Sequence, residues 1–592
     1  MPITPSRWQT SLNRVLVLVI SLLPVGALLW HRRLPNAPDF FRHLVLSELF
    51  SEAISAGVWY PRWIPDLNGG YGYPVFVFYQ PGYFYVAHLF SLADPPVVRC
   101  ALTLGAIALI GGLGAYRLIR SFFPPRVSLF FLLMFQLTPY HFTEIYRLGH
   151  LSEWIALQLS PWPLHLLYCL ARTPPDRRAQ PWLGIGFALA LTGMCYAHPV
   201  TLVFFLPTLV AMACGQGLSL PPRDRPPYFR RAFLGILMAV VLSSPYWLTV
   251  ATMRRYVNSH AALGGYFDPV THLLSPVAFV WSEADMLSRH LGLSFELGPV
   301  HIVLALAGAW WGRRNPFVTT AFVLYAALLL LMTPAVPWFW SLYPFYLVQF
   351  PWRLLAVSAV FQLISMLGLA RLDRIGDRTA VALAVALVMF TAVWHSDELV
   401  FRPMPGNVLE SPEARRMIGE SFPAPATFVP VDVATPSARD VRNAMANVRH
   451  AVPQTRLATL DGASEWMPIT AVGHPLRGPR GESFLESLNG LASWVANKGS
   501  SKFRLDYVID VVTSSTVLVN QLYLPGWRVS LNGRAVPDAT LRDHVHPDGR
   551  IAVSLGPGRH RLQAWYDGPP GWRWKLLTML TMAGGFIVWM FR

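Results

Sequence analysis

The sequence contains few charged residues, few cysteines and almost no lysine. Charged side chains make up 14% of its 592 residues, four residues are cysteine and three are lysine. The cysteines lie within or beside apolar runs and lack the spacing of metal ligands, so they predict neither a cysteine metal site nor a disulfide framework. No glycine-rich nucleotide-binding motif, HExxH motif or GxSxG motif is present. Redox, ATP-driven and serine-hydrolase chemistry therefore have no support in the sequence.

Apolar residues dominate instead. Hydrophobic residues make up 53% of the chain and the mean hydropathy is +0.39, which is typical of a polytopic membrane protein. The formal net charge is +16, but the arginines form short clusters between apolar runs rather than one basic domain. This pattern indicates membrane topology and not nucleic-acid binding. Arg7 and Arg14 precede the first apolar run, which we interpret as a retained first span.

Runs of about 20 mostly apolar residues predict about twelve transmembrane helices. The expected spans are 12–30, 98–118, 127–143, 154–171, 181–197, 199–216, 231–250, 297–311, 316–334, 352–370, 379–395 and 573–591. With the N-terminus inside, all five inner loops carry arginine clusters, as the inner loops of membrane proteins do. The outer side then holds these segments: 31–97, 144–153, 251–296, 335–352 and 396–572.

The outer loop 31–97 has the most distinctive sequence. Asp39 and His43 are spaced to lie on one face of a helix, and the apolar residues around them predict a helix in the membrane interface. In the following glycine-rich loop, Tyr71 and Tyr73 alternate with glycines that let the backbone approach a ligand, and Gln80 comes soon after. Such a loop beside carboxylates suits a polar substrate carried on a lipid. Interfacial anchoring by aromatic side chains is the alternative interpretation.

Other candidate binding residues lie near the outer ends of the expected spans: Glu144, Arg147, His150, Glu153, His198 and Arg353. A carboxylate, an imidazole and a guanidinium close together at a span end are more than topology requires. The planar guanidinium of Arg353 suits a lipid phosphate, although an arginine at a span end also reaches the interface without any function. His198 is a lone histidine, and a satisfied polar residue is the simpler interpretation.

The composition changes at about residue 396. From there to 572, prolines and polar residues are frequent and no run is long enough to cross a membrane. Between Phe503 and Tyr566, apolar residues alternate with polar ones and turn signals such as Asn532-Gly533 recur. The sequence therefore predicts a transmembrane module over 1–395, an outer domain over 396–572 that is a β-sandwich or jelly roll from about 503, and a final helix over 573–592.

Together these groups suit transfer of a group from a substrate that the membrane delivers. In a sugar linked to a polyprenyl phosphate, the phosphate is already a fair leaving group. The protein then needs a carboxylate to accept the proton of the attacking hydroxyl and cations to hold the departing phosphate. Asp39 is the candidate base, and Arg353 or Arg147 is the candidate phosphate ligand. Direct displacement would invert the anomeric carbon.

Several motifs occur together in this chain: DFFRH, GVWYPRW, NGGYGYPVFVFYQP, RLGHLSEW, QFPWR, LYLPGWRVSLNG and GPGRHRLQAWY. With an acidic residue just after the first span, the chain resembles the GT-C superfamily of membrane glycosyltransferases. In these motifs it more closely resembles the bacterial membrane proteins labelled as related to 6-pyruvoyl-tetrahydropterin synthase, and their YfhO-like relatives. The resemblance implies a polyprenyl-phosphate sugar donor, a lipid, glycan or protein acceptor, and a place in the bacterial inner membrane with the active site and C-terminal domain outside.

By the same resemblance, Asp39 is the catalytic acidic residue. Many members have a second acidic residue beside the first, whereas Phe40 follows Asp39 here, so Glu144 or Glu153 would have to take that place. Dependence on Mg²⁺ or Mn²⁺ stays open, because one carboxylate is a poor site for either ion. His43 completes the catalytic candidates. A transporter or flippase of lipid-linked sugars and a non-catalytic scaffold for envelope assembly are the alternatives.

Overall fold

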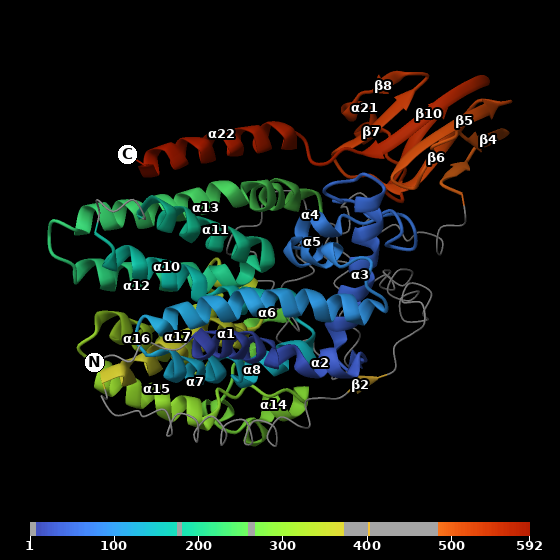
Figure 1. Ribbon diagram of the computed structural model, residues 1–592. Coiled ribbons are helices and arrows are strands. Elements are labelled where there is room, and N and C mark those ends of the chain that lie inside the picture. The colour runs from blue at the N-terminus through green and yellow to red at the C-terminus, as the bar shows by residue number, and fades with distance from the viewer. Residues whose placement is uncertain (1–6, 175–179, 258–266, 372–400, 403–482, 592) are drawn as a thin grey trace.

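The computed structural model describes residues 7–174, 180–257, 267–371, 401–402 and 483–591. Most of the chain before residue 372 is a bundle of helices that run roughly side by side (Figure 1). These helices are α1 (Arg7–Leu22), α2 (Gly26–His31), α6 (Pro96–Arg120), α7 (Pro125–Gln136), α8 (Pro139–Phe142), α9 (Leu151–Leu159), α10 (Pro161–Arg172), α11 (Gln180–Ala197), α12 (Pro199–Leu218), α13 (Arg225–Met253), α15 (Pro299–Gly312), α16 (Pro316–Leu331) and α17 (Leu354–Met366). The last helix, α22 (Trp572–Phe591), packs along α13.

Five helical stretches of the described chain are long and apolar enough to cross a membrane: Ser11–His31, Pro96–Arg120, Pro199–Leu218, Arg225–Tyr256 and Pro351–Arg371. Three shorter helices are also apolar: Pro125–Gln136, Pro299–Gly312 and Pro316–Leu331. By length and composition, these helices confirm the expected polytopic membrane protein. The expected number of twelve spans is not confirmed, and the expected span 379–395 lies outside the described residues.

Prolines divide two of the expected spans. The span expected over 127–143 is broken, because α7 ends at Gln136 and a new helix begins at Pro139, which has no N–H for a helical hydrogen bond. The span expected over 154–171 is likewise shared between α9 and α10, and Pro161 begins the second helix. A proline does not always end a helix here, since Pro207 lies inside α12 and Pro245 inside α13.

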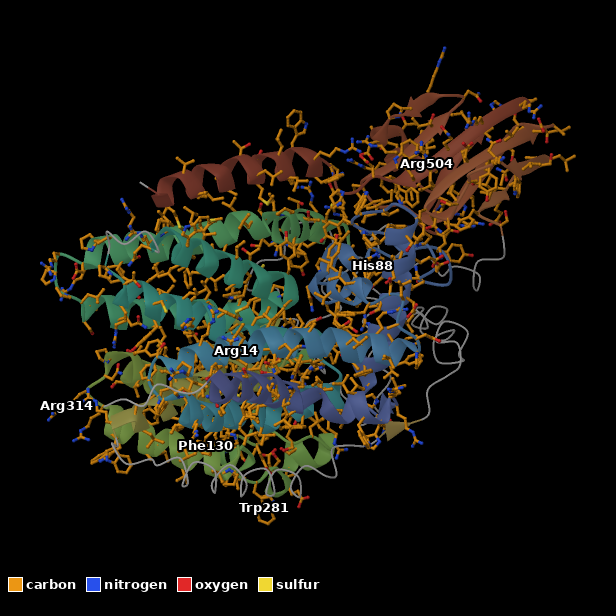
Figure 2. All side chains as sticks on the ribbon, in the orientation of Figure 1. Arg14, His88, Phe130, Trp281, Arg314 and Arg504 are labelled. Atoms are coloured by element: carbon orange, nitrogen blue, oxygen red, sulfur yellow. The ribbon has the colours of Figure 1, made fainter. Side chains whose placement is uncertain are left out.

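Helix α3 (Pro38–Ser55) lies across one end of the bundle, next to α4 (Val75–Phe78) and α5 (Gly82–Leu89) (Figure 1). The expected helix is present, but most of its side chains are buried within the protein, so its place in the membrane interface stays a prediction. Proline at its first position is favourable because that N–H needs no partner. Strand β1 (Leu34–Pro35) pairs with β2 (Phe401–Arg402) just before it. Arg314 lies at the opposite end of the bundle (Figure 2), as expected for an inner loop.

At the α3 end, the chain from Leu485 to Tyr566 forms a two-layer β-sandwich, and its strands begin earlier than the expected position near 503. Its antiparallel sheets have the orders β4-β5-β10-β7-β8 and β3-β6-β9. The strands are β3 (Leu485–Ser487), β4 (Ala492–Ala496), β5 (Arg504–Val511), β6 (Ser515–Leu522), β7 (Trp527–Leu531), β8 (Arg534–Val536), β9 (Arg550–Leu555) and β10 (Gly558–Tyr566), with α21 (Asp538–Asp543) between β8 and β9. Ile509 of one sheet and Val519 of the other share one core.

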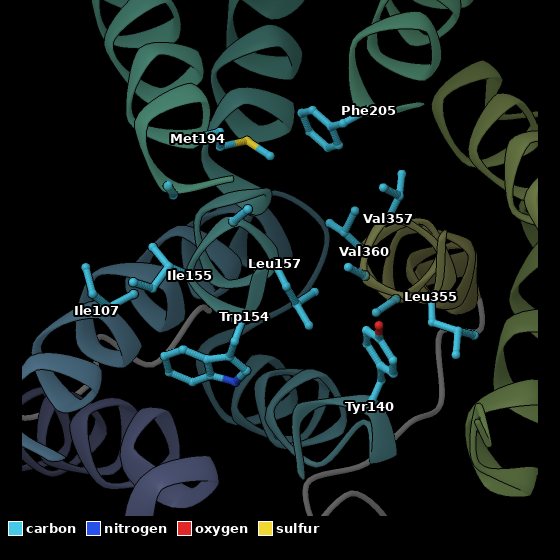
Figure 3. Packing of buried hydrophobic residues seen from close by; sticks show 14 of the residues in the cluster. Ile107, Tyr140, Trp154, Ile155, Leu157, Met194, Phe205, Leu355, Val357 and Val360 are labelled. Carbon is cyan, nitrogen blue, oxygen red and sulfur yellow. The ribbon is translucent and has the colours of Figure 1, made fainter. Parts of the chain in front are cut away.

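Apolar side chains from helices far apart in the sequence fill the interior of the bundle. Figure 3 shows Ile107 of α6, Trp154 of α9, Phe205 of α12 and Val360 of α17 within this core. Trp154 is completely buried, and its size makes it a strong anchor for α9. Since Glu153 is the preceding residue of α9, this packing also fixes the place of its carboxylate.

Candidate active site

A close backbone contact creates the candidate site. The π-helical segment η2 (Thr143–Leu148) ends at Gly149, whose φ of +74° favours glycine. A Cβ atom at Gly149 would lie 2.8 Å from Phe40 Cα and 2.9 Å from the carbonyl carbon of Asp39. Only a residue without a side chain permits this approach between η2 and the start of α3. The contact places His150, the next residue, beside the Asp39 carboxylate.

His150 lies between two carboxylates. Its Nε2 is 3.4 Å from Asp39 Oδ2, and its Nδ1 is 3.6 Å from Glu144 Oε1. Burial alone would lower the pKa of His150, but the two adjacent carboxylates raise it to about 10. The imidazole is therefore protonated and positively charged at neutral pH, and it compensates part of the negative charge around it.

Asp39 is the most accessible carboxylate of the site. About 35% of its side chain is exposed, whereas the Glu144 side chain is fully buried. Burial would raise the pKa of Asp39, but the hydrogen bond and the positive charge of His150 lower it from 3.8 to about 2. Asp39 is thus ionised at any physiological pH and open to a hydroxyl group that approaches from outside.

His43 supports the first turn of α3 from the inside. Its Nδ1 donates a hydrogen bond to the backbone carbonyl of Asp39 at 2.8 Å, so its Nε2 accepts one from the Tyr79 hydroxyl at 3.2 Å. Burial lowers the pKa of His43 to about 4, so the ring is neutral at pH 7. Only 1% of His43 is exposed. The structure therefore gives it a supporting position behind Asp39, and the sequence-based catalytic assignment stays a prediction.

Glu153 and Arg353 form the other part of the site. Arg353 Nε is 3.3 Å from Glu153 Oε2, and the Tyr140 hydroxyl donates a hydrogen bond to Glu153 Oε1 at 3.1 Å. The guanidinium also donates to the Val348 carbonyl at 3.1 Å and lies over the ring of Phe350. These contacts hold Arg353 in one orientation next to a carboxylate.

The group around His150 and the pair of Glu153 and Arg353 adjoin each other. One ligand atom each from Glu144, His150 and Glu153 lies within 4.8 Å of the others. We call Asp39 and these three residues the carboxylate cluster. Within the described residues, neither oxygen of the buried Glu144 carboxylate has a hydrogen-bond donor. The charge of His150 compensates this carboxylate in part, but its Nδ1 is 3.6 Å from Oε1, beyond hydrogen-bond distance, so both oxygens can still accept from a ligand.

The glycine-rich loop with Tyr71 and Tyr73 lies elsewhere. Both tyrosines are buried, and the loop packs against the β-sandwich. Gln521 of β6 accepts a hydrogen bond from Trp63 Nε1 at 2.8 Å and donates to the Gly70 carbonyl at 2.9 Å. The glycines of this loop permit close packing of two parts of the protein, and the binding roles of Tyr71 and Tyr73 remain predictions.

For the other predicted binding residues, His198, Gln80 and Arg147, we describe no hydrogen bond or ion pair with the carboxylate cluster. His198 is close enough to His150 and Arg353 to interact with their charges, but its Nδ1 is hydrogen-bonded to the Thr201 hydroxyl group at 2.8 Å. Gln80 is buried next to Tyr79, and Arg147 is half-buried in η2. Their binding roles remain predictions.

Two tyrosines of the site were not among the predicted residues. Tyr140 reaches Glu153, and Tyr79 reaches His43. Tyr140 lies four residues before Glu144, a spacing that places two side chains on one helical face. That spacing was a usable signal, whereas nothing local in the sequence connects Tyr79 with His43.

No family model matches this chain, and no curated protein matches its sequence. Among solved structures, the oligosaccharyltransferase AglB from Archaeoglobus fulgidus, in complex with an inhibitory peptide and a dolichol-phosphate, is 14% identical, with a TM-score of 0.39 over 68% of this chain and 57% of that chain. Arabinofuranosyltransferase AftD from Mycobacteria is 17% identical, with a TM-score of 0.39 over 68% of this chain and 28% of that chain. The match thus spans 28% to 57% of these two neighbours, and at these scores it is a partial likeness of shape.

Proposed function

We propose that this protein is a membrane glycosyltransferase of the GT-C type. It moves a sugar from a polyprenyl-phosphate donor to an acceptor on the outer side of the bacterial inner membrane. The observation that carries the proposal is the carboxylate cluster beside Arg353. A partly exposed, ionised carboxylate and a fixed guanidinium belong to one group of contacts at the end of the helical bundle, an arrangement that suits a lipid-linked phosphate and an aqueous acceptor.

In the proposed step, the acceptor hydroxyl attacks the anomeric carbon of the sugar. Asp39 accepts the proton of that hydroxyl as the new carbon–oxygen bond forms. The bond between the anomeric carbon and the phosphate oxygen breaks at the same time, and polyprenyl phosphate leaves with the electron pair. Arg353 binds the phosphate as its negative charge grows, and the displacement inverts the anomeric centre. His150 holds Asp39 in the orientation that faces the acceptor.

The cluster also fits a divalent cation. Glu144, His150 and Glu153 supply two carboxylates and one imidazole, and the Glu144 oxygens have no donor within the described residues. This donor set suits Mn²⁺ better than Mg²⁺, because Mg²⁺ prefers oxygen ligands alone. A bound cation would compensate phosphate charge. His150 would have to lose the proton on Nδ1 to bind it, and the remaining Nε2–H could still be donated to Asp39.

Replacement of Asp39 by asparagine tests the proposal. We expect the D39N variant to lose about 10²- to 10⁴-fold in transfer rate, the usual contribution of a positioned general base. The assay follows sugar transfer from polyprenyl-phosphate donors to membrane acceptors, with the variant checked for correct folding by its Tm. The matched control is Glu52→Gln in the same helix, since the partly exposed Glu52 carboxylate pairs with Lys502. Transfer by folded D39N at the rate of E52Q would refute the proposed base.

A further inference from the structure

Arg62 lies in the segment between α3 and α4 and has no carboxylate partner in the described residues. Only 6% of it is exposed. Its guanidinium carbon is 3.9 Å from the centre of the Tyr60 ring and 4.8 Å from that of the Trp572 ring. The titratable groups that influence it most are tyrosines, including Tyr85 and Tyr196. A positive charge is thus enclosed by aromatic rings.

Several hydrogen-bond donors converge here without an acceptor. Arg62 Nε and Trp572 Nε1 are both buried, and neither has a hydrogen-bond partner among the described residues. Lys575, on the first turn of α22, is close enough to Arg62 for their charges to repel each other. Its ammonium lies 3.4 Å from one hydroxyl oxygen, that of Thr252. Two positive charges and an indole N–H therefore share one region.

The aromatic rings explain only part of this arrangement. A ring face attracts a cation, but it is a poor acceptor for the N–H groups at the edge of the guanidinium plane. Gly568 borders Trp572 Nε1 and a second nitrogen of the Arg62 guanidinium: a Cβ atom there would lie 3.2 Å from both Arg62 Nη1 and Trp572 Nε1. Glycine thus keeps a side chain away from these two nitrogens, and the unpartnered buried Arg62 Nε and Trp572 Nε1 require an acceptor.

We propose that Arg62, Trp572 and Lys575 form a binding site for the phosphate of an anionic lipid headgroup. A phosphate oxygen accepts hydrogen bonds from both the guanidinium and the indole, and its charge compensates the two cations. The site lies at the start of α22, where that helix runs along α13 (Figure 1), so acyl chains have apolar helix surfaces to follow. Aromatic residues around a headgroup are typical of the membrane interface.

The site is separate from the candidate active site. Tyr79, just before α5, contacts His43 behind the carboxylate cluster, whereas Tyr85 on α5 lies on the side of Arg62. The proposal therefore stands whether or not the protein transfers sugars. It predicts a structural or regulatory lipid that joins the aromatic loop 59–63 to the last helix.

Lipid binding by the full-length protein in detergent tests this proposal. The probe is dioctanoyl phosphatidylglycerol, titrated by native mass spectrometry and by the Tm shift in tryptophan fluorescence. We expect Arg62→Gln and Lys575→Gln each to weaken binding about tenfold, since each removes a charged hydrogen-bond donor. The control is Arg573→Gln in the same turn, because Arg573 is exposed and already paired with Asp567 at 2.8 Å. Its affinity should stay within about twofold of the wild type.

Equal affinity of R573Q and K575Q for the lipid would overturn the site, even if R62Q proved too unstable to purify. A parallel titration with inorganic phosphate identifies the source of the anion. We expect free phosphate to bind more weakly than the lipid by at least tenfold, because it lacks acyl chains that bury apolar surface. Equal binding of free phosphate would overturn the assignment to a lipid.

Discussion

Two polar regions near α3 differ in how completely their buried groups are paired. One is the junction between the β-sandwich and the outer loop, which we define by Trp63, Asp66, Lys502 and Gln521. Its contacts are short: Lys502 Nζ lies 2.6 Å from the carboxylates of both Glu52 and Asp66, and the Gln521 amide accepts from Trp63 Nε1 at 2.8 Å. The junction is a satisfied polar interface between two packed parts of the chain.

The carboxylate cluster has the same kinds of groups but longer contacts. The charged atoms of the cluster and of the adjacent Arg353 are separated by 3.3 to 3.6 Å, and the Glu144 oxygens have no hydrogen-bond donor in the described residues. A polar interface made for stability pairs its buried groups, whereas a site that binds a ligand keeps some of them unpaired until the ligand arrives. We therefore assign stability to the junction and binding to the cluster.

The largest expected effect that separates the two regions comes from Glu144→Gln. The change removes a buried negative charge that has no hydrogen-bond donor in the described residues, but it also leaves the His150 imidazolium with one carboxylate, so we expect the Tm to change little. Transfer activity should fall about 10²-fold, since His150 loses one of its two carboxylates and any bound cation loses a ligand. Activity assays and thermal unfolding on the same preparation check both parts. A lower Tm with normal transfer would show that Glu144 serves stability and not binding.

A smaller loss of activity should follow Gly149→Ala. The new methyl group meets the backbone of Asp39 and Phe40, and φ at this position is +74°, so the loop must move away from α3. A displacement of about 1 Å between His150 and Asp39 is expected to lower transfer by up to about 10²-fold. Gly57→Ala is a suitable control, because Gly57 also has a positive φ but nothing lies within 4 Å of its Cβ position. Equal activities of the two variants would exclude a positioning role for Gly149.

The junction should respond mainly in stability. Gln521→Ala leaves the buried indole N–H of Trp63 without an acceptor, which destabilises a protein by about 1–3 kcal/mol. Unfolding monitored by fluorescence should show this loss, while transfer per folded molecule stays close to the wild type. Loss of activity without loss of stability in Q521A would show that the junction takes part in substrate binding.

The stability of the cluster should depend on pH in the alkaline range. The pKa of His150 is raised from 6.5 to about 10. Its contribution to the free energy of unfolding is therefore fully present below pH 6.5 and is lost as the pH rises through 10. The pKa of Asp39 is lowered to about 2, so its contribution is lost only as the pH falls through about 2. We therefore expect the Tm to fall from pH 7 to 10. The fall should be smaller in His150→Gln, and an equal fall would show that His150 is not charged.

The smallest effect is expected for Lys502→Met. The ion pairs with Glu52 and Asp66 are short but partly exposed, and such pairs contribute about 0–1 kcal/mol. Salt should weaken this contribution further. Denaturation at low and high ionic strength measures both effects. A loss as large as that of Q521A would mean that the junction depends on charge more than on buried hydrogen bonds.

Local patterns in the sequence predicted individual elements well. The spacing of Asp39 and the apolar residues after it indicated α3, and the turn at Asn532-Gly533 indicated part of the β-sandwich. The number of spans was harder to predict, because Pro139 and Pro161 interrupt apolar runs that hydropathy alone treats as continuous. The loop with Tyr71 was predicted to approach a ligand because it is rich in glycine. Glycine permits close approach of another part of the protein equally well, and in the structure the loop packs against the β-sandwich.

The sequence by itself determined that this is an apolar, arginine-rich membrane protein with a β-rich region near its C-terminus, because hydropathy, charge placement and strand periodicity are local properties. Only the tertiary structure decided which polar residues meet. Asp39 and His150 are 111 residues apart, and Glu153 and Arg353 are 200 apart, in the chain. Their contacts depend on the packing of α9 against α17 and on the fit of Gly149 to the backbone of α3. No local pattern specifies such distant contacts, since they arise when separate helices bury their apolar faces against one another.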